Sequence, residues 1–199
     1  MSPAHVLEPT YRRLKSALME GAWPDGAKLE AMRLAEDLGV SMSPVRDSLN
    51  QLVGEGLVDL TPGEGFRVPF LTEQTLRDIL DVNAALLEAA AHNDGGALGP
   101  VVGTDKSDDY VGRVSAAFSA FASSGGNRFL LESIERINDR LHRVRTLEPE
   151  VLPSAHETLQ EIEASLQGLR EDRLNALKNY HRTCRRHLPQ LIKSLPGRR

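Results

Sequence analysis

The sequence predicts a mainly α-helical protein of two units, a small N-terminal unit of three helices with a hairpin and then an all-helical unit. Apolar residues recur three and four positions apart through most of the 199 residues, the period of a helix with one buried face. Hydrophobic residues make up 40% of the chain and aromatic residues only 5%, so the core must be mainly aliphatic. A proline-containing linker at residues 69–71 marks the boundary between the two units, which are residues 1–70 and residues 71–199.

Composition narrows the class of protein further. The single cysteine, Cys184, allows no intrachain disulfide, which suits a reducing cytoplasm. No apolar run reaches about 18 residues, and residues 1–21 contain no apolar signal core, so we expect a cytoplasmic protein without a membrane partner. The formal net charge of −4 does not by itself indicate a nucleic-acid binder.

Two helices are predicted in the first 40 residues. The segment YRRLKSALMEG has apolar residues on one helical face: Tyr11, Leu14, Leu18 and Met19. A turn is expected at WPDGAKL, with Asp25 and Gly26 at its tip. A second helix is expected over Glu30–Leu38, and Gly39 stands where a left-handed C-cap belongs.

A third helix is predicted directly after this break. Ser41 or Ser43 is expected to cap it, and Pro44 suits the first turn, where its missing N–H has no partner to lose. Its inward residues are expected to be Val45, Leu49, Leu52 and Val53. The helix is expected to end at Gly54 or Gly56.

Two short strands, residues 57–60 and 65–68, are predicted to form a hairpin around the turn TPGE. Two helices joined by a tight turn form a helix-turn-helix, and the hairpin adds a wing. The second helix of such a motif fits the major groove and presents its leading end to base edges and phosphates. There, Ser41 and Ser43 can donate to phosphate oxygens, and Arg46 can bind guanine or phosphate bidentately. The fold class predicted is therefore a winged helix-turn-helix followed by an all-α bundle.

The second unit is helical throughout its pattern. Its first helix is expected to run towards Ala91, with one stripe formed by Leu76, Ile79, Leu80, Asn83 and Leu87. Residues 92–109 contain several glycines and are expected to be a long loop. Later helices are expected at residues 114–121 and 153–166, and the stripe from Leu130 to Val144 predicts another of about 19 residues. The stripe from Leu174 to Leu195 marks the last helix.

The N-terminal unit resembles the DNA-binding domain of the GntR family of bacterial transcription regulators. Four segments carry the resemblance over about 60 residues: GAWPDGAKL, RLAEDLGVSMSPVRDSL, QLVGEGLV and GEGFRV. The resemblance implies a homodimer that binds double-stranded operator DNA. By position, it implies DNA contacts from Arg33, Ser41, Ser43, Arg46 and Gly65.

Two residues depart from the family pattern. Met42 stands where the family usually has arginine, and Glu64 stands at the wing tip, which is usually basic or carries histidine. Residues 1–70 also hold seven Lys or Arg against ten Asp or Glu. Because non-specific affinity depends on cations that release counterions, we expect it to be weak and binding to depend on a few arginines in a dimer.

The second unit resembles the helical sensor of the FadR-like (FCD-type) branch of this family, in LRDILDVNAALLEAAA and FSAFASSGGNRFLLESIERINDRLHRVR. Many members of this branch bind a divalent metal through one Asp and three His. By position, these ligands fall near Ser115, on Ser119, near Leu159 with His156 one turn away, and on His181. Serine is a poor ligand for such metals, so we expect no metal and no other cofactor.

A small effector, such as an organic acid, is the remaining ligand that the resemblance implies. Asn83, Ser119 and His181 are the inward polar candidates to bind it. Each can equally be satisfied within the core, which would leave a purely dimerising regulator without an effector. The segments contain no phosphate-binding glycine loop, no nucleophile elbow and no HExxH pair, so we expect no enzyme. A winged helix that binds another protein is the alternative to DNA binding.

Overall fold

The structure is a computed structural model that describes residues 4–92 and 109–196 in two units. The first unit ends at Leu71, and the second spans Thr72–Leu195. Most of the predicted loop at residues 92–109 lies outside the described residues. In the described part of the chain, no helix is both long and apolar enough to cross a membrane.

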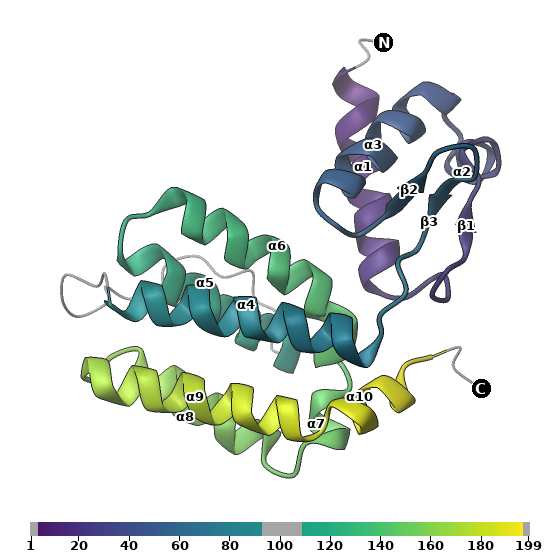
Figure 1. Cartoon of the computed structure of the whole chain (residues 1–199). Coiled ribbons are helices and arrows are strands. Elements are labelled where there is room, and N and C mark those ends of the chain that lie inside the picture. The colour runs from purple at the N-terminus through teal and green to yellow at the C-terminus, as the bar shows by residue number, and fades with distance from the viewer. Residues whose placement is uncertain (1–3, 93–108, 197–199) are drawn as a thin grey trace. The chain divides into compact units, whose positions relative to one another are not determined.

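The first unit contains three helices, α1 (Ala4–Met19), α2 (Ala31–Leu38) and α3 (Met42–Gly54) (Figure 1). Both α1 and α2 pack against α3. The predicted break between α2 and α3 is confirmed, because Gly39 has a φ of 68° and Ser41 is the N-cap of α3.

A three-stranded antiparallel sheet completes the first unit, with the strand order β1-β3-β2. The hairpin consists of β2 (Asp59–Thr61) and β3 (Gly65–Arg67), close to the predicted strands. The prediction of only a turn before α2 is wrong, because Lys28–Leu29 form β1 and pair with β3. A two-residue strand has no periodicity of its own, and only its distant partner defines it.

The core of the first unit lies between the helices and the sheet. Its buried members are Leu14, Leu18, Leu29, Leu34, Ala35, Val45, Leu49, Leu52, Val58 and Val68. Of the four residues of α3 that were expected to point inward, Val45, Leu49 and Leu52 are each 0% exposed, and Val53 is partly buried against the same core. One side of α3 is therefore fully used for packing, which leaves the opposite side for solvent or a ligand.

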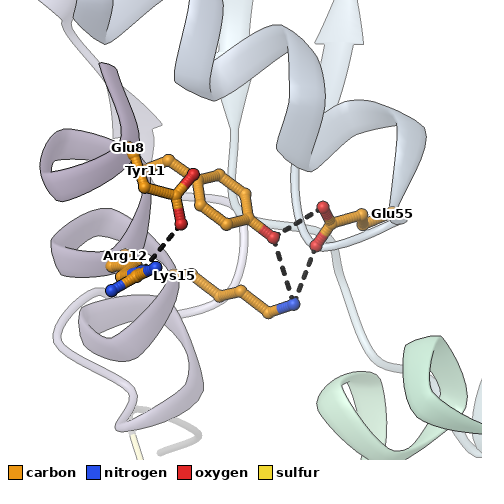
Figure 2. A network of polar contacts seen from close by, with 5 residues as sticks. All are labelled: Glu8, Tyr11, Arg12, Lys15 and Glu55. Carbon is orange, nitrogen blue, oxygen red and sulfur yellow. Dashed lines mark hydrogen bonds and ion pairs between the residues drawn. The ribbon is translucent and has the colours of Figure 1, made fainter. Parts of the chain in front are cut away.

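A polar network joins α1 to the end of α3 (Figure 2). Tyr11 donates its hydroxyl to Glu55 Oε1 at 2.7 Å, and Lys15 Nζ lies 3.0 Å from Glu55 Oε2 and 3.2 Å from the Tyr11 hydroxyl. Glu55 is the C-cap residue of α3. Burial, and then the hydrogen bond to Glu55, raise the pKa of Tyr11, so the hydroxyl stays protonated and continues to donate. The network therefore ties α1 to the C-terminal end of α3.

The second unit consists of helices in its described part. Its elements are α4 (Glu73–His92), α5 (Tyr110–Ser124), α6 (Arg128–Arg145), α7 (Glu148–Val151), α8 (Ala155–Ser165), α9 (Arg170–Arg186) and α10 (Leu188–Ser194). The predicted inward stripe of α4 is confirmed, since all five of its residues are buried. α4 contacts α5, α6 and α9, so it lies at the centre of this unit.

The helices of this unit differ from the prediction in three places. α5 begins at Tyr110 rather than at residue 114, because the Asp109 side chain accepts from Gly112 N and caps an earlier turn. The short helix α7 was missed, since four residues carry no detectable period. The last helix is two helices, α9 and α10, because Pro189 has no N–H to donate and its ring would clash with the preceding turn.

Candidate nucleic-acid interface and buried polar cluster

The solvent side of α2 and α3 carries four of the five residues that the family resemblance assigns to DNA. Arg33 lies in the first turn of α2, while Ser41, Ser43 and Arg46 lie at the start of α3, and all four are exposed. Arg46 follows Ser43 by three positions, so the two side chains are neighbours on one helix face. The leading end of α3 is thus open to a ligand, while its other side is in the core.

The polar groups of these residues are not used within the protein. Ser41 has an extended backbone (φ −77°, ψ 165°) as an N-cap residue requires, but its side chain makes no capping hydrogen bond. Neither Arg33 nor Arg46 forms a hydrogen bond or ion pair with any residue that the structure describes. Exposed donors without internal partners bind an external acceptor at no loss of an existing bond.

The wing turns through two glycines with positive φ, Gly63 (82°) and Gly65 (88°). An added Cβ at Gly65 would meet nothing within 4 Å, so glycine is required there by the backbone conformation and not by crowding. The acidic tip residue Glu64 lies 3.5 Å from Arg67 Nε, and Arg67 also donates to Gly26 O at 3.2 Å. Arg67 therefore offsets part of the tip's negative charge, a role that the sequence reading missed although the residue stands in the quoted GEGFRV.

A second group of polar residues is buried inside the helical unit. Asn83 on α4 and His181 on α9 are 0% and 2% exposed, and His181 Nε2 lies 2.9 Å from Asn83 Oδ1. His181 Nδ1 lies 2.8 Å from Leu177 O, so Nδ1 is the donor of the ring. Burial lowers the pKa of His181 to about 4, and a neutral ring that donates from Nδ1 accepts at Nε2. Rotation of the Asn83 amide by a half-turn exchanges Oδ1 and Nδ2. Nδ2, which otherwise has no partner, then donates to His181 Nε2.

Arg145, at the end of α6, is 0% exposed and belongs to the same interior. Its NH1 group donates to Asn138 Oδ1 at 2.8 Å and to Ser115 Oγ at 3.2 Å. Its guanidinium lies 5.0 Å from the ring centre of Phe118, and that ring stacks on His181 at 6.1 Å. Nε and NH2 of Arg145 are buried without a hydrogen-bond partner in the described part of the chain.

The third of the expected effector residues, Ser119, joins this cluster through Asn138, whose Nδ2 donates to Ser119 Oγ at 3.3 Å. The structure therefore brings Asn83 and His181 together directly, and connects Ser119 to Arg145 through Asn138. The sequence reading missed Arg145 because it stands among exposed-looking charges in DRLHRVR.

Glu148 is a buried carboxyl group whose environment includes the positive charge of Arg145. It is 1% exposed and accepts from the hydroxyls of Tyr110 and Tyr180 at 2.8 Å each, and Cys184 Sγ lies 3.8 Å away. Burial raises the pKa of Glu148 above its usual value, and the positive charge of Arg145 and these hydrogen-bond donors offset only part of that rise. Burial also raises the pKa of Cys184 well above its usual value, so this cysteine is a protonated core residue and not a reactive thiolate.

The residues of this interior do not fit the metal site of the FadR-like branch. Within the described residues, no three His, Cys, Asp or Glu side chains lie together as metal ligands. His181 already uses both ring nitrogens, and His156 is exposed with its ring edge-on to Tyr110 at 5.5 Å. Ser115 and Ser119 are hydrogen-bonded to the Arg145 and Asn138 side chains instead.

Three helices, a β-wing and an exposed leading end of the third helix define a winged helix-turn-helix, the DNA-binding class of transcription regulators. Residues 8–68 match the model of the bacterial regulatory proteins of the gntR family. Residues 8–68 are thus a GntR-type winged helix-turn-helix, and the chain is a DNA-binding transcription regulator of that type.

Relatives match over nearly the whole chain. The HTH-type transcriptional repressor GlaR of Escherichia coli (strain K12) is 28% identical over 197 residues, which cover 86% of this chain and 90% of GlaR. The Nta operon transcriptional regulator of Aminobacter aminovorans is 25% identical over 191 residues, which cover 86% of this chain and 88% of that regulator.

The fold is shared with solved structures. The structure of E. coli McbR/YncC superposes with a TM-score of 0.68 at 22% identity, over 92% of this chain and 97% of that one. A GntR regulator from Rhodococcus sp. RHA1 gives 0.67 at 20% identity, over 94% and 98%. Both alignments run through the two units, so the helical unit as well as the winged helix has a known fold.

Proposed function

We propose that this regulator is a homodimeric repressor that binds its operator by placing α3 in the major groove. In this proposal Ser41, Ser43 and Arg46 contact bases and phosphates, Arg33 contacts the backbone, and Gly65 allows the wing to approach the duplex. One observation carries this proposal. The exposed arginines and serine hydroxyls of α2 and α3 have no hydrogen-bond or ion-pair partner among the described residues, while the opposite side of α3 is buried. A repressor role follows the relative GlaR, which is named as one.

Operator binding by full-length protein tests this proposal. The probe is a labelled duplex from upstream of the regulator's own gene, titrated at a fixed, stated salt concentration. Arg46→Ala is expected to weaken binding by about 1–3 kcal/mol, the effect of losing one bidentate contact. Arg13→Ala on α1 removes the same charge from an exposed site outside the proposed interface and serves as the matched control. Equal affinities for the two variants would overturn the assignment of Arg46.

The dimer has its own measurable consequence. Two copies of α3 related by a two-fold axis read half-sites about 34–36 Å apart, which is one turn of DNA. We expect a palindromic operator, and cutting the duplex to one half-site is expected to abolish tight binding. A regulator that acts on chromosomal operators works in the cytoplasm of a bacterial cell.

We further propose that the helical unit is an FCD-type sensor whose effector is a small organic acid. Arg145, which lies in the buried cluster with Asn83, Ser119 and His181, supports this proposal, whereas Asn83 and His181 pair with each other. Arg145 holds two buried donors without partners, and a guanidinium with two free N–H groups matches a carboxylate bidentately. A buried unpaired donor is costly, so a ligand that satisfies it is favoured.

Thermal unfolding in the presence of small carboxylic acids tests the effector. A true effector is expected to raise the melting temperature of the wild type by mass action. Arg145→Lys keeps the charge but removes the fork, so it is expected to abolish the rise, whereas Arg140→Lys on the exposed side of α6 is expected to keep it. An acid that stabilises wild type and Arg145→Lys equally would contradict the role of Arg145. A unit that responds to no acid would be a dimerisation device alone.

A further inference from the structure

Met42 is the first residue of α3 and is 42% exposed among the residues proposed to touch DNA. Arg46 follows it by four positions, so the two side chains are neighbours along one helix face. The rest of the exposed face of α3 is polar and contains Ser43, Arg46, Asp47, Asn50 and Gln51. An apolar side chain is therefore presented at the leading end of a helix whose other exposed groups are polar.

A thioether in the major groove has few partners. Its sulfur donates nothing to the acceptors of guanine and accepts only weakly from the amino groups of adenine and cytosine. Pressing it against those edges would bury polar groups without partners. The C5-methyl of thymine is the one apolar group that a base presents in this groove, and an unbranched methionine adapts its shape to such a contact.

We propose that Met42 determines specificity by reading the C5-methyl of a thymine in each half-site. The inference rests on the proposed function, in which α3 lies in the major groove. The charge of the unit favours it too. Residues 1–70 contain seven Lys or Arg and ten Asp or Glu, so the attraction to phosphate is small and contacts to bases supply more of the discrimination.

The test removes the methyl group alone. Binding duplexes are first selected from a randomised library with full-length protein. Each thymine of the selected duplex is then replaced by deoxyuridine, which differs only in lacking the C5-methyl. At one thymine in each half-site, the replacement is expected to weaken wild-type binding about fourfold, the value for one buried methyl-sized group. Met42→Ala is expected to bind the thymine duplex more weakly by a similar factor and to lose its response to uracil at that position.

The control is Met32→Ala, which removes another exposed methionine, 63% exposed on α2, and is expected to keep the uracil response. Circular dichroism of Met42→Ala checks that α3 remains folded, as an exposed site with a good helix former implies. The inference fails if no thymine is sensitive to loss of its methyl, or if Met42→Ala keeps the wild-type response. If either of these results is obtained while Arg46→Ala still weakens binding, the role of Met42 is refuted and the proposed function stands. If full-length protein selects no duplex, both the inference and the proposed function are overturned.

Discussion

His181 makes the stability of the helical unit depend on pH, and substitution of this one residue isolates the effect. Its pKa is about 4 in the folded protein because the ring is buried, against 6.5 in an exposed histidine. Between these values the unfolded chain binds a proton that the folded chain does not. The stabilisation is therefore complete above about pH 6.5 and is lost as the pH falls towards 4.

The difference between the folded and unfolded pKa values of His181 determines how strongly the free energy of unfolding depends on pH. Between pH 7 and pH 5, a histidine with these two pKa values lowers the free energy of unfolding by about 2 kcal/mol. His181→Gln has no titratable side chain at this position and removes this component, while all other residues are the same in the two proteins. The difference in stability between wild type and variant is thus expected to shrink by about 2 kcal/mol over this range.

Urea unfolding at the two pH values measures the effect. Circular dichroism at 222 nm follows the helices of both units, whereas Trp23, the only tryptophan of the chain, reports on the first unit alone by fluorescence. The Trp23 transition serves as an internal control, because the substitution lies in the other unit. If wild type and His181→Gln lose the same stability from pH 7 to pH 5, the ring is not held neutral by burial and the reasoning is wrong.

Three other substitutions test the packing. Leu49→Ala in the core of the first unit is expected to lower the free energy of unfolding by about 2–5 kcal/mol, seen in the Trp23 transition. Gly39→Ala at a φ of 68° is expected to cost about 1–2 kcal/mol, and Gly39→Asn less because asparagine tolerates this conformation; equal losses would argue against a backbone cause. Arg145→Met removes the hydrogen bonds to Asn138 and Ser115 and the positive charge that acts on buried Glu148, and is expected to cost about 3–5 kcal/mol, measured by urea unfolding. Adding Glu148→Gln is expected to recover part of that loss, and a further loss instead would contradict an electrostatic interaction between the two residues.

The sequence by itself determined the features that a few consecutive residues encode. The buried stripes of α3 and α4 follow from apolar residues at helical spacing. The sharp break between α2 and α3 follows from Gly39, which adopts the left-handed conformation, and from Ser41 at the N-cap. The candidate DNA-binding surface was predictable from the sequence for the same reason, since Ser41, Ser43 and Arg46 belong to one continuous segment.

Only the tertiary structure decided the features that join distant residues. The strand β1 exists because Leu29 pairs with Phe66, and Arg145 is buried because Ser115 and Asn138 accept its hydrogen bonds. An arginine followed by a glutamate three positions later is by pattern a solvent-exposed pair. Whether such charges enter a core depends on partners far along the chain, because the desolvation of a charge is offset only by groups that the fold brings to it.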